Sequence, residues 1–360
     1  MPNLTIDTIR AVLKTHVDPL VGNNLVDAGV LGDVRVEAGR AIVEIELGFP
    51  AAGYRDELIA GVQQTLLAAT GASSEVRVSW KIQSHGVQAK LQPLQTVKNI
   101  IAVASGKGGV GKSTVAVNLA LALMAEGARV GILDADIYGP SQPRMLGTSE
   151  KPTSPDGKVM LPIHAHGMQA MSIGFLIDEE QPMIWRGPMA TQALMQLFGE
   201  TRWDEMDYLV VDLPPGTGDI QLTLSQRIPV SGAIVVTTPQ DIALLDARKG
   251  LQMFRRVEVP ILGLVENMSF FCCPNCGHQS DIFGTGGGQS MSEQYDVELI
   301  GRVPLDAQIR QQADSGMPTV AADPESAVSA IYRDIARKAA ARLAHGTPAD
   351  AFPDIEVAED

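Results

Sequence analysis

The sequence contains few cysteines, few basic residues and no long apolar run. Only three of its 360 residues are cysteine, and all three lie within residues 272–276. Cysteines this few and this close together exclude a disulfide framework and suit a reducing compartment, so we expect a cytoplasmic protein. No apolar run reaches about eighteen residues, which excludes a transmembrane helix.

Basic residues are scarce relative to acidic ones. The chain has 28 Lys and Arg against 42 Asp and Glu, and its formal net charge is −14. A nucleic-acid-binding surface needs clustered positive charge, because it must neutralise phosphates. A chain that docks on a membrane would favour a basic amphipathic C-terminal helix, whereas residues 346–360 are acidic. We therefore expect neither nucleic acid nor a membrane among the partners.

The length and the 45% hydrophobic content allow about two domains with a sizeable core. Residues 1–83 combine helical patterns at residues 5–16 and 55–70 with alternating strand patterns such as residues 41–47, which predicts a small α+β domain. The polar residues 84–96 are expected to form a linker. Residues 97–345 form the second domain, and residues 346–360 are expected to be an acidic, flexible tail.

In the second domain, short apolar runs alternate with helical segments. The runs occupy residues 97–104, 129–133, 208–211, 233–237 and 261–265. Their length and β-branched content suit strands that are buried on both faces of a parallel sheet. The predicted fold class is therefore α/β, with a mostly parallel sheet preceded by the α+β domain. Ligands of such sheets bind at the carboxyl ends of the strands.

The first of these strands leads into a glycine-rich loop that fits G-x-x-x-x-G-K-[ST], the phosphate-binding P-loop. Its glycines let successive N–H groups point at phosphate oxygens. Lys112 brings a positive charge to the β and γ phosphates, and the Ser113 hydroxyl can ligate Mg²⁺. The residues expected to contact the nucleotide are Gly106, Lys107, Gly108, Gly109, Val110, Gly111, Lys112, Ser113 and Thr114. The sequence thus predicts a P-loop NTPase domain.

Lys107 is a second lysine within this loop, and one bound triphosphate does not need two lysines. The form K-G-G-x-G-K-[ST] resembles the deviant Walker A loop of the MinD, ParA and nitrogenase-iron-protein class. In that class the extra lysine reaches across a dimer interface to the partner's nucleotide. The resemblance implies that Lys107 is catalytic in a homodimer. The alternative is a solvated loop lysine.

Acidic residues follow two of the predicted strands. Asp134 and Asp136 follow the run at residues 129–133, and Asp212 follows the run at residues 208–211. A carboxylate at a strand end near the phosphates can hold Mg²⁺ directly or through water. Asp212 is the metal-binding candidate; Asp136 is a candidate for orienting the attacking water, and Asp134 for supporting the metal. Such aspartates also act as helix caps or turn formers, so the division of work between Asp134 and Asp136 stays open.

The cysteines form the motif C-x-x-C at Cys273 and Cys276, with Cys272 next to it. This spacing lets two thiolates face one metal, but a zinc site or an iron–sulfur cluster needs four ligands. His278 and Cys272 could complete a strained site within one chain. Two chains together would supply Cys273 and Cys276 twice. Zinc, a redox pair and a buried structural pair are competing interpretations, and thiolates alone do not select the metal.

Residues 106–114, 134–141, 212–219, 267–276 and 282–288 together resemble the Mrp/ApbC iron–sulfur cluster carrier family. Residues 17–29 resemble the MIP18-like (DUF59) domain of iron–sulfur assembly proteins. Many such domains carry a cysteine after the second strand, but residues 49–54 of this chain contain none. A docking or structural role is therefore expected for the N-terminal domain.

The carrier resemblance implies ATP binding with Mg²⁺, slow ATP hydrolysis and a homodimer. It also implies a labile [4Fe–4S] cluster that bridges two subunits and is transferred to apo iron–sulfur proteins, with cluster scaffold proteins as further partners. By the same resemblance, Asn267 contacts adenine. Two alternatives stay open: a positioning ATPase of the ParA or MinD kind, and a metallochaperone for another metal such as zinc.

Overall fold

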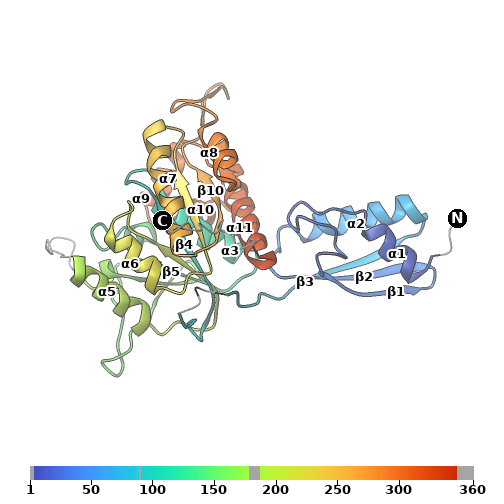
Figure 1. Cartoon of the computed structure of the whole chain (residues 1–360), viewed down its shortest axis with the longest axis horizontal. Coiled ribbons are helices and arrows are strands. Elements are labelled where there is room, and N and C mark those ends of the chain that lie inside the picture. Colours follow the sequence, from blue (N-terminus) through green and yellow to red (C-terminus); the bar gives the residue numbers. More distant parts are fainter. Residues whose placement is uncertain (1–3, 87, 89–90, 178–186, 347–360) are drawn as a thin grey trace, which may run out of the picture.

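The computed structural model of the protein describes residues 4–86, 88, 91–177 and 187–346. Figure 1 shows a small blue domain at one side and a larger body, coloured teal to red, at the other. Nearly all of the tail expected at residues 346–360 lies outside the described residues, as do residues 87, 89 and 90 of the expected linker. Among the described residues, no helix is long and apolar enough to cross a bilayer.

The small domain is a three-stranded sheet with two helices. In chain order its elements are α1 (Ile6–Leu13), β1 (Leu31–Glu37), β2 (Arg40–Leu47), α2 (Arg55–Thr70) and β3 (Ser74–Trp80). β1 pairs antiparallel with β2, and β3 lies parallel to β2 because α2 provides the crossover. α2 coincides with the helical pattern of the sequence, whereas α1 is shorter than the pattern at residues 5–16.

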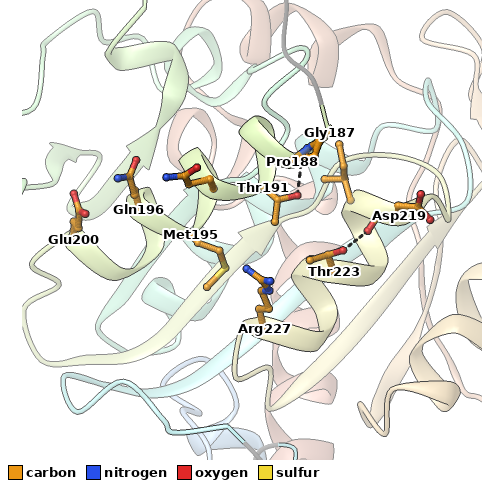
Figure 2. Close-up of a pocket in the computed structure, with 11 residues that line it drawn as sticks. Gly187, Pro188, Thr191, Met195, Gln196, Glu200, Asp219, Thr223 and Arg227 are labelled. Carbon is orange, nitrogen blue, oxygen red and sulfur yellow. Dashed lines mark hydrogen bonds between the residues drawn. The ribbon is translucent and has the colours of Figure 1, made fainter.

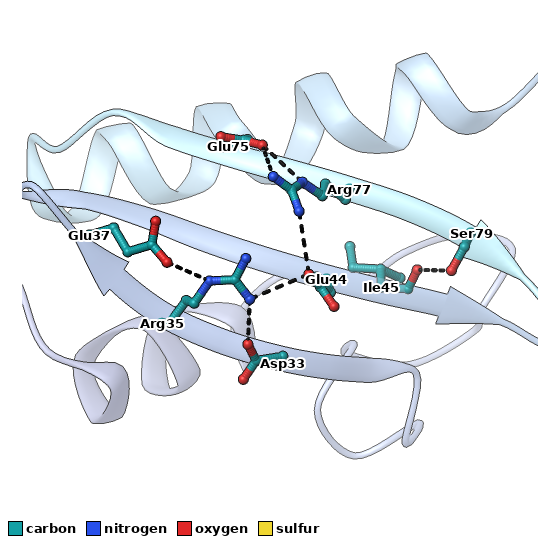
Figure 3. A network of polar contacts seen from close by, with 8 residues as sticks. All are labelled: Asp33, Arg35, Glu37, Glu44, Ile45, Glu75, Arg77 and Ser79. Atoms are coloured by element: carbon teal, nitrogen blue, oxygen red, sulfur yellow. Dashed lines mark hydrogen bonds and ion pairs between the residues drawn. The ribbon is translucent and has the colours of Figure 1, made fainter.

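Charged side chains cover one face of this sheet, as Figure 3 shows. Arg35 on β1 contacts Asp33, Glu37 and Glu44, and the Arg77 guanidinium lies 3.7 Å from the Glu44 carboxylate. These side chains are 35–57% exposed, so each pair contributes little to stability. The face is therefore solvated, and the apolar side chains of the sheet pack on the opposite face against α1 and α2.

The large domain contains an eight-stranded sheet with the order β13-β10-β9-β4-β8-β5-β7-β6. All neighbouring strands are parallel except β6 and β7 at one edge. This confirms the predicted α/β fold. The strands are β4 (Val97–Ser105), β5 (Val130–Asp134), β6 (Ile163–Ala165), β7 (Met168–Ser172), β8 (Met206–Asp212), β9 (Gly232–Thr237), β10 (Ile261–Glu266) and β13 (Leu299–Arg302).

Helices cover both faces of this sheet, which is why its central strands are buried throughout. Alternate side chains of β4 divide between two cores: Ile101 and Val103 pack toward α3 and α11, whereas Ala102 and Ala104 pack toward the opposite layer. The helices are α3 (Lys112–Ala125), α4 (Gln142–Met145), α5 (Gly187–Glu200), α6 (Asp219–Arg227), α7 (Asp241–Arg256), α8 (Gly287–Tyr295), α9 (Ala307–Asp314), α10 (Thr319–Ala322) and α11 (Ala327–His345), with a 3-10 turn at Ile173–Phe175.

The two domains meet at a buried carboxylate. Glu126, directly after α3, is fully buried and accepts a hydrogen bond from the Gly53 N–H at 2.8 Å and one from Arg333 Nε at 3.1 Å. Arg337 of α11 lies 3.8 Å from the same carboxylate. A charge removed from water needs such partners to be stable. The loop at residues 49–54 therefore contacts the large domain at this carboxylate, and the Ala52 N–H also donates to the Glu126 carbonyl at 3.1 Å.

Candidate functional site

The P-loop connects β4 to α3 at the carboxyl edge of the sheet. Gly111, directly before α3, has φ +81°, a conformation that favours glycine, and a Cβ there would lie 2.2 Å from Asn267 Nδ2. No side chain caps the first turn of α3, so its N–H groups remain available. A helix N-terminus with free N–H groups is a ready anion site, which suits phosphate.

Lys112 is the first residue of α3 and is almost completely buried, with 6% of its side chain exposed. Its ammonium pairs with the Asp212 carboxylate, and it lies 3.2 Å from Ser113 Oγ and 3.9 Å from Asp136 Oδ2. The structure thus brings together four of the predicted residues from three segments far apart in the sequence. A cation surrounded by two carboxylates at a phosphate-binding loop can bind the negative charge of a nucleotide.

Asp134 and Asp212 are opposite each other in the pairing of β5 with β8. Asp134 is fully buried, and its carboxylate accepts hydrogen bonds from the N–H groups of Asp136, Ser141 and Gln142 and from Ser172 Oγ, at 3.0–3.1 Å. Burial, and then the nearby Asp212 charge, raise the pKa of Asp134 to about 7. These contacts hold the loop after β5 in place, so they favour the loop-forming role of Asp134 over direct metal binding.

Asp136 is more accessible, with 14% of its side chain exposed. Burial raises the pKa of Asp136, and the Lys112 charge opposes this shift. This carboxylate is therefore accessible and lies next to the P-loop lysine. A residue that orients an attacking water molecule needs such a position.

Gln142 is a site residue that the sequence patterns did not indicate. Its Nε2 donates to Asp212 Oδ2 at 2.9 Å and to the Ser113 carbonyl at 3.2 Å. Gln142 Oε1 and Ser141 Oγ are buried and have no hydrogen-bond partner among the described residues. Gln142 Oε1 is thus an unpaired buried oxygen on a side chain that contacts Ser113 and Asp212, and oxygen ligands of this kind suit Mg²⁺. Only the position of Gln142 directly after the acidic motif at residues 134–141 could have identified it.

Lys107 is half-buried and directly precedes the exposed part of the loop, Gly108 and Gly109. Among the described residues its side chain forms no hydrogen bond or ion pair, whereas its carbonyl accepts a hydrogen bond from Ser105 Oγ at 2.9 Å. The ammonium is therefore not used within its own P-loop, in contrast to Lys112.

Asn267 follows β10 and is 6% exposed. Its Nδ2 donates to the Val110 carbonyl of the P-loop at 2.8 Å, and its N–H donates to the Thr237 carbonyl of β9 at 2.8 Å. The side chain therefore connects the end of β10 to the P-loop. Adenine contact by Asn267 stays a prediction.

The cysteines lie on a small hairpin formed by β11 (Phe271–Cys272) and β12 (Gln279–Ser280), which we call the cysteine hairpin, residues 271–280. The Cys273 N–H donates to the His278 carbonyl at 2.9 Å, and the Cys272 thiol donates to the Gly277 carbonyl at 3.5 Å. N–H groups of Asn275 and Cys276, and then the Cys276 side chain, lower the pKa of Cys273. Such N–H···S contacts stabilise a thiolate, the form that binds metals.

All three cysteines are free thiols, and Cys276 is exposed. Within the described parts of the chain, no three His, Cys, Asp or Glu side chains form a group that could hold a metal ion. His278 and Cys272 therefore do not complete a site with Cys273 and Cys276 in one chain. The hairpin offers a thiolate pair.

A cavity of about 690 Å³ lies between α5 and α6 and is lined by Thr191, Met195, Asp219, Thr223 and Arg227 among others (Figure 2). The hydroxyls of Thr191 and Thr223 donate to carbonyls one turn earlier in their own helices, at 3.1 and 2.6 Å. Asp219 begins α6 and ends the segment at residues 212–219 that starts with Asp212, so this cavity lies next to that segment.

Comparison with known proteins agrees with this geometry. Residues 96–340 match the family model described as NUBPL iron-transfer P-loop NTPase, of the ParA group. The chain belongs to this family. Residues 6–80 match a second model, described as iron-sulfur cluster assembly protein, which confirms the resemblance of the N-terminal domain to that family.

Relatives of high identity cover most of the chain. It is 52% identical over 341 residues to the iron-sulfur cluster carrier protein of Escherichia coli K12, with 93% of this chain and 91% of the relative covered. It is 47% identical to the mouse iron-sulfur cluster transfer protein NUBPL over 285 residues, which cover 79% and 89% of the two chains. A nucleotide-binding protein of Archaeoglobus fulgidus, solved with ADP, is 38% identical and superposes with a TM-score of 0.56 over 62% of this chain and 88% of that one.

Proposed function

We propose that this protein binds iron–sulfur clusters and transfers them to apo-proteins, in a cycle that uses ATP. The observation that carries the proposal is the cysteine hairpin. It presents Cys273 and Cys276 in the segment directly after Asn267, a residue that contacts the P-loop at 2.8 Å. The cluster-carrier names of relatives at 52% and 47% identity support the same function.

ATP is the proposed nucleotide, bound by residues 106–114 and hydrolysed slowly. Lys112 leaves Asp212 to bind the β and γ phosphates, because a phosphate carries more negative charge than one carboxylate. Ser113 and Asp212 would hold Mg²⁺, which would neutralise phosphate charge; Asp134 supports this site through the loop at residues 135–142. Asp136 orients the attacking water, since its carboxylate is accessible and lies beside Lys112.

A homodimer is the proposed active form. Lys107 is free to reach a partner's nucleotide, where a positioned cation would stabilise developing charge on the transferring phosphoryl group. Large apolar side chains are exposed on segments that follow carboxyl ends of strands, as a dimer interface at that edge requires: Tyr138, Ile242, Leu245 and Ile282.

The proposed cargo is a [4Fe–4S] cluster that bridges two subunits. Cys273 and Cys276 of each chain supply the four thiolates that such a cluster needs. The recipients are apo iron–sulfur proteins, with cluster scaffold proteins as sources. The free cysteines suit a reducing cytoplasm.

We propose residues 1–83 as the MIP18-like domain, 84–96 as the linker, 97–345 as the carrier domain and 346–360 as a tail. The N-terminal domain has no cysteine, so its proposed role is docking.

Anaerobic reconstitution with iron and sulfide tests this function. We expect visible absorption of an iron–sulfur cluster, about four iron atoms per dimer, and activation of an apo-protein on mixing. Tight zinc binding without iron uptake would instead support a metallochaperone. Failure of any metal to bind would leave a positioning ATPase as the surviving alternative.

A further inference from the structure

Glu266, the last residue of β10, is a buried acidic residue that the proposed chemistry does not use. Only 1% of its side chain is exposed. Its carboxylate accepts hydrogen bonds from Ser269 Oγ and from the Gly288 N–H, the latter at 2.7 Å. Arg302, at the end of β13, lies 3.3 Å from the same carboxylate and donates to Ser269 Oγ at 2.8 Å. A buried charge with this many donors is a rigid junction, because each lost partner leaves charge uncompensated.

The partners of Glu266 lie on either side of the cysteines in the sequence. Ser269 precedes the cysteine hairpin and Gly288 follows it, in the first turn of α8. A single carboxylate therefore holds both ends of residues 270–287, the cysteine segment. The approach at Gly288 is so close that a Cβ there would lie 2.6 Å from Glu266 Oε2.

The same short stretch also contacts the P-loop. Asn267, next to Glu266, donates to the Val110 carbonyl at 2.8 Å. Met268 has φ +54°, which is strained for a residue with a side chain and persists only where the surroundings hold it. This turn lets Asn267 face the P-loop while Glu266 and Ser269 face each other at the base of the cysteine segment. A movement of the P-loop backbone at Val110 therefore reaches the cysteine segment through a rigid junction.

We propose that Glu266 is a positioning residue that couples nucleotide occupancy of the P-loop to the geometry of the cysteine segment. The proposal rests on the carrier function. It names the residues through which a bound nucleotide would alter the cluster site. Glu266 lies outside both the P-loop and the cysteine segment. It transmits the change by holding Ser269 and Gly288 to the strand end that Asn267 ties to the P-loop.

The test uses metal-free, reduced, full-length protein, so that its readout does not depend on cluster assembly. Alkylation rates of Cys273 and Cys276 by iodoacetamide are measured by mass spectrometry, without nucleotide, with Mg²⁺ and ADP, and with Mg²⁺ and a non-hydrolysable ATP analogue. Calorimetry gives the affinity of each nucleotide. In the parent protein we expect nucleotide to change the alkylation rate by about five-fold or more, the lower end of ordinary coupling between sites.

The variant Glu266→Gln keeps the side-chain shape but removes the charge that pairs with Arg302. It also leaves one acceptor oxygen where Ser269 and Gly288 now use two, so one of their hydrogen bonds to this side chain must be lost or reversed. We expect its nucleotide affinity to stay within about two-fold of the parent while the alkylation response disappears, because coupling is separate from binding at either site. Ser269→Ala, which releases one end only, should reduce the response and serves if Glu266→Gln fails to fold. Glu293→Gln, on the exposed side of α8, is the matched control and should respond as the parent does.

A full response in Glu266→Gln and Ser269→Ala would overturn the proposal, as would a parent that binds nucleotide without any change in alkylation. In either case the carrier function would stand. A parent that binds no nucleotide would overturn the ATP-dependent function and the coupling together. If Glu293→Gln lost the alkylation response to the same extent, this would also contradict the role of Glu266, since removal of any carboxylate near the cysteine segment would then have the same effect.

Discussion

The Lys112 ammonium contacts the Asp212 carboxylate, and these two side chains are 6% and 0% exposed. Their residues are far apart in the chain and meet because β4 and β8 are neighbours in the sheet. The pair holds the P-loop lysine at the carboxyl edge of the sheet.

Lys112→Ala should reduce ATP turnover by about a hundred-fold or more, because it removes the positioned cation that binds the β and γ phosphates. Calorimetry with ATP and a phosphate-release assay measure the effect. Lys249→Ala, which removes an exposed lysine paired with Asp246, is the control and should turn over normally. Unchanged affinity and turnover in Lys112→Ala would remove the P-loop assignment.

Lys107→Ala should leave the fold and nucleotide affinity intact but reduce turnover by about a hundred-fold, since its ammonium is unused within its own loop and is proposed to act on the partner's phosphoryl group. Mixing Lys107→Ala with Lys112→Ala subunits should restore activity at one of the two sites of each mixed dimer. The Lys107→Ala variant hydrolysing ATP at the parent rate would contradict this prediction.

Asp212→Asn should lose Mg²⁺-dependent hydrolysis while the protein still holds a reconstituted cluster, because the cysteine hairpin does not contact Asp212. Hydrolysis across a Mg²⁺ titration and iron content per dimer measure the two properties separately. Parent-rate hydrolysis would exclude Asp212 from the metal site, and loss of iron would show that the two sites are not separable.

Cys273→Ala and Cys276→Ala should each remove the iron, whereas Cys272→Ala should keep about four iron atoms per dimer. The Cys272 thiol turns toward the Gly277 carbonyl, while Cys273 lies next to Cys276. Full iron retention in the Cys273→Ala, Cys276→Ala double variant would defeat the ligand assignment.

The lowered pKa of Cys273 predicts a pH dependence. Its thiolate persists at lower pH, so the rate of its alkylation should reach a plateau at lower pH than in the unfolded chain.

Glu126→Ala should lower the free energy of unfolding by about 1.5–3 kcal/mol, the usual value of hydrogen bonds to a charged group. It removes the acceptor of the Gly53 N–H, which joins the domains, and the buried partner of Arg333 and Arg337 within the large domain. Urea unfolding measures the change in the free energy of unfolding. The rate of proteolysis of the segment that connects the domains reports on their contact. Glu205→Ala, whose carboxylate is 83% exposed, is the control and should change stability by less than about 0.5 kcal/mol. Equal stability of Glu126→Ala and the parent would show that the docking depends on other contacts.

Local patterns predicted much of the fold. Residues 55–70 form the expected helix, and the apolar runs form the parallel strands, because helix and strand periodicity depends on near neighbours and on burial of one or both faces. Residue order also predicted that the acidic motifs lie at strand ends. The short α1 and the role of residues 49–54 were not predictable, since both depend on contacts with the rest of the fold.

The sequence by itself determined the P-loop, the thiolate pair at Cys273 and Cys276 and the alternation of strands with helices, because each depends on residues within a few positions of one another. The tertiary structure alone decided which buried polar groups meet. Asn267 reaches Val110, Gln142 reaches Asp212 and Glu126 reaches Gly53 only because the strand order and the docking of the domains bring distant segments together. Each of these groups is buried, so burial without that partner would leave a polar group unsatisfied, and this cost is what selects the arrangement.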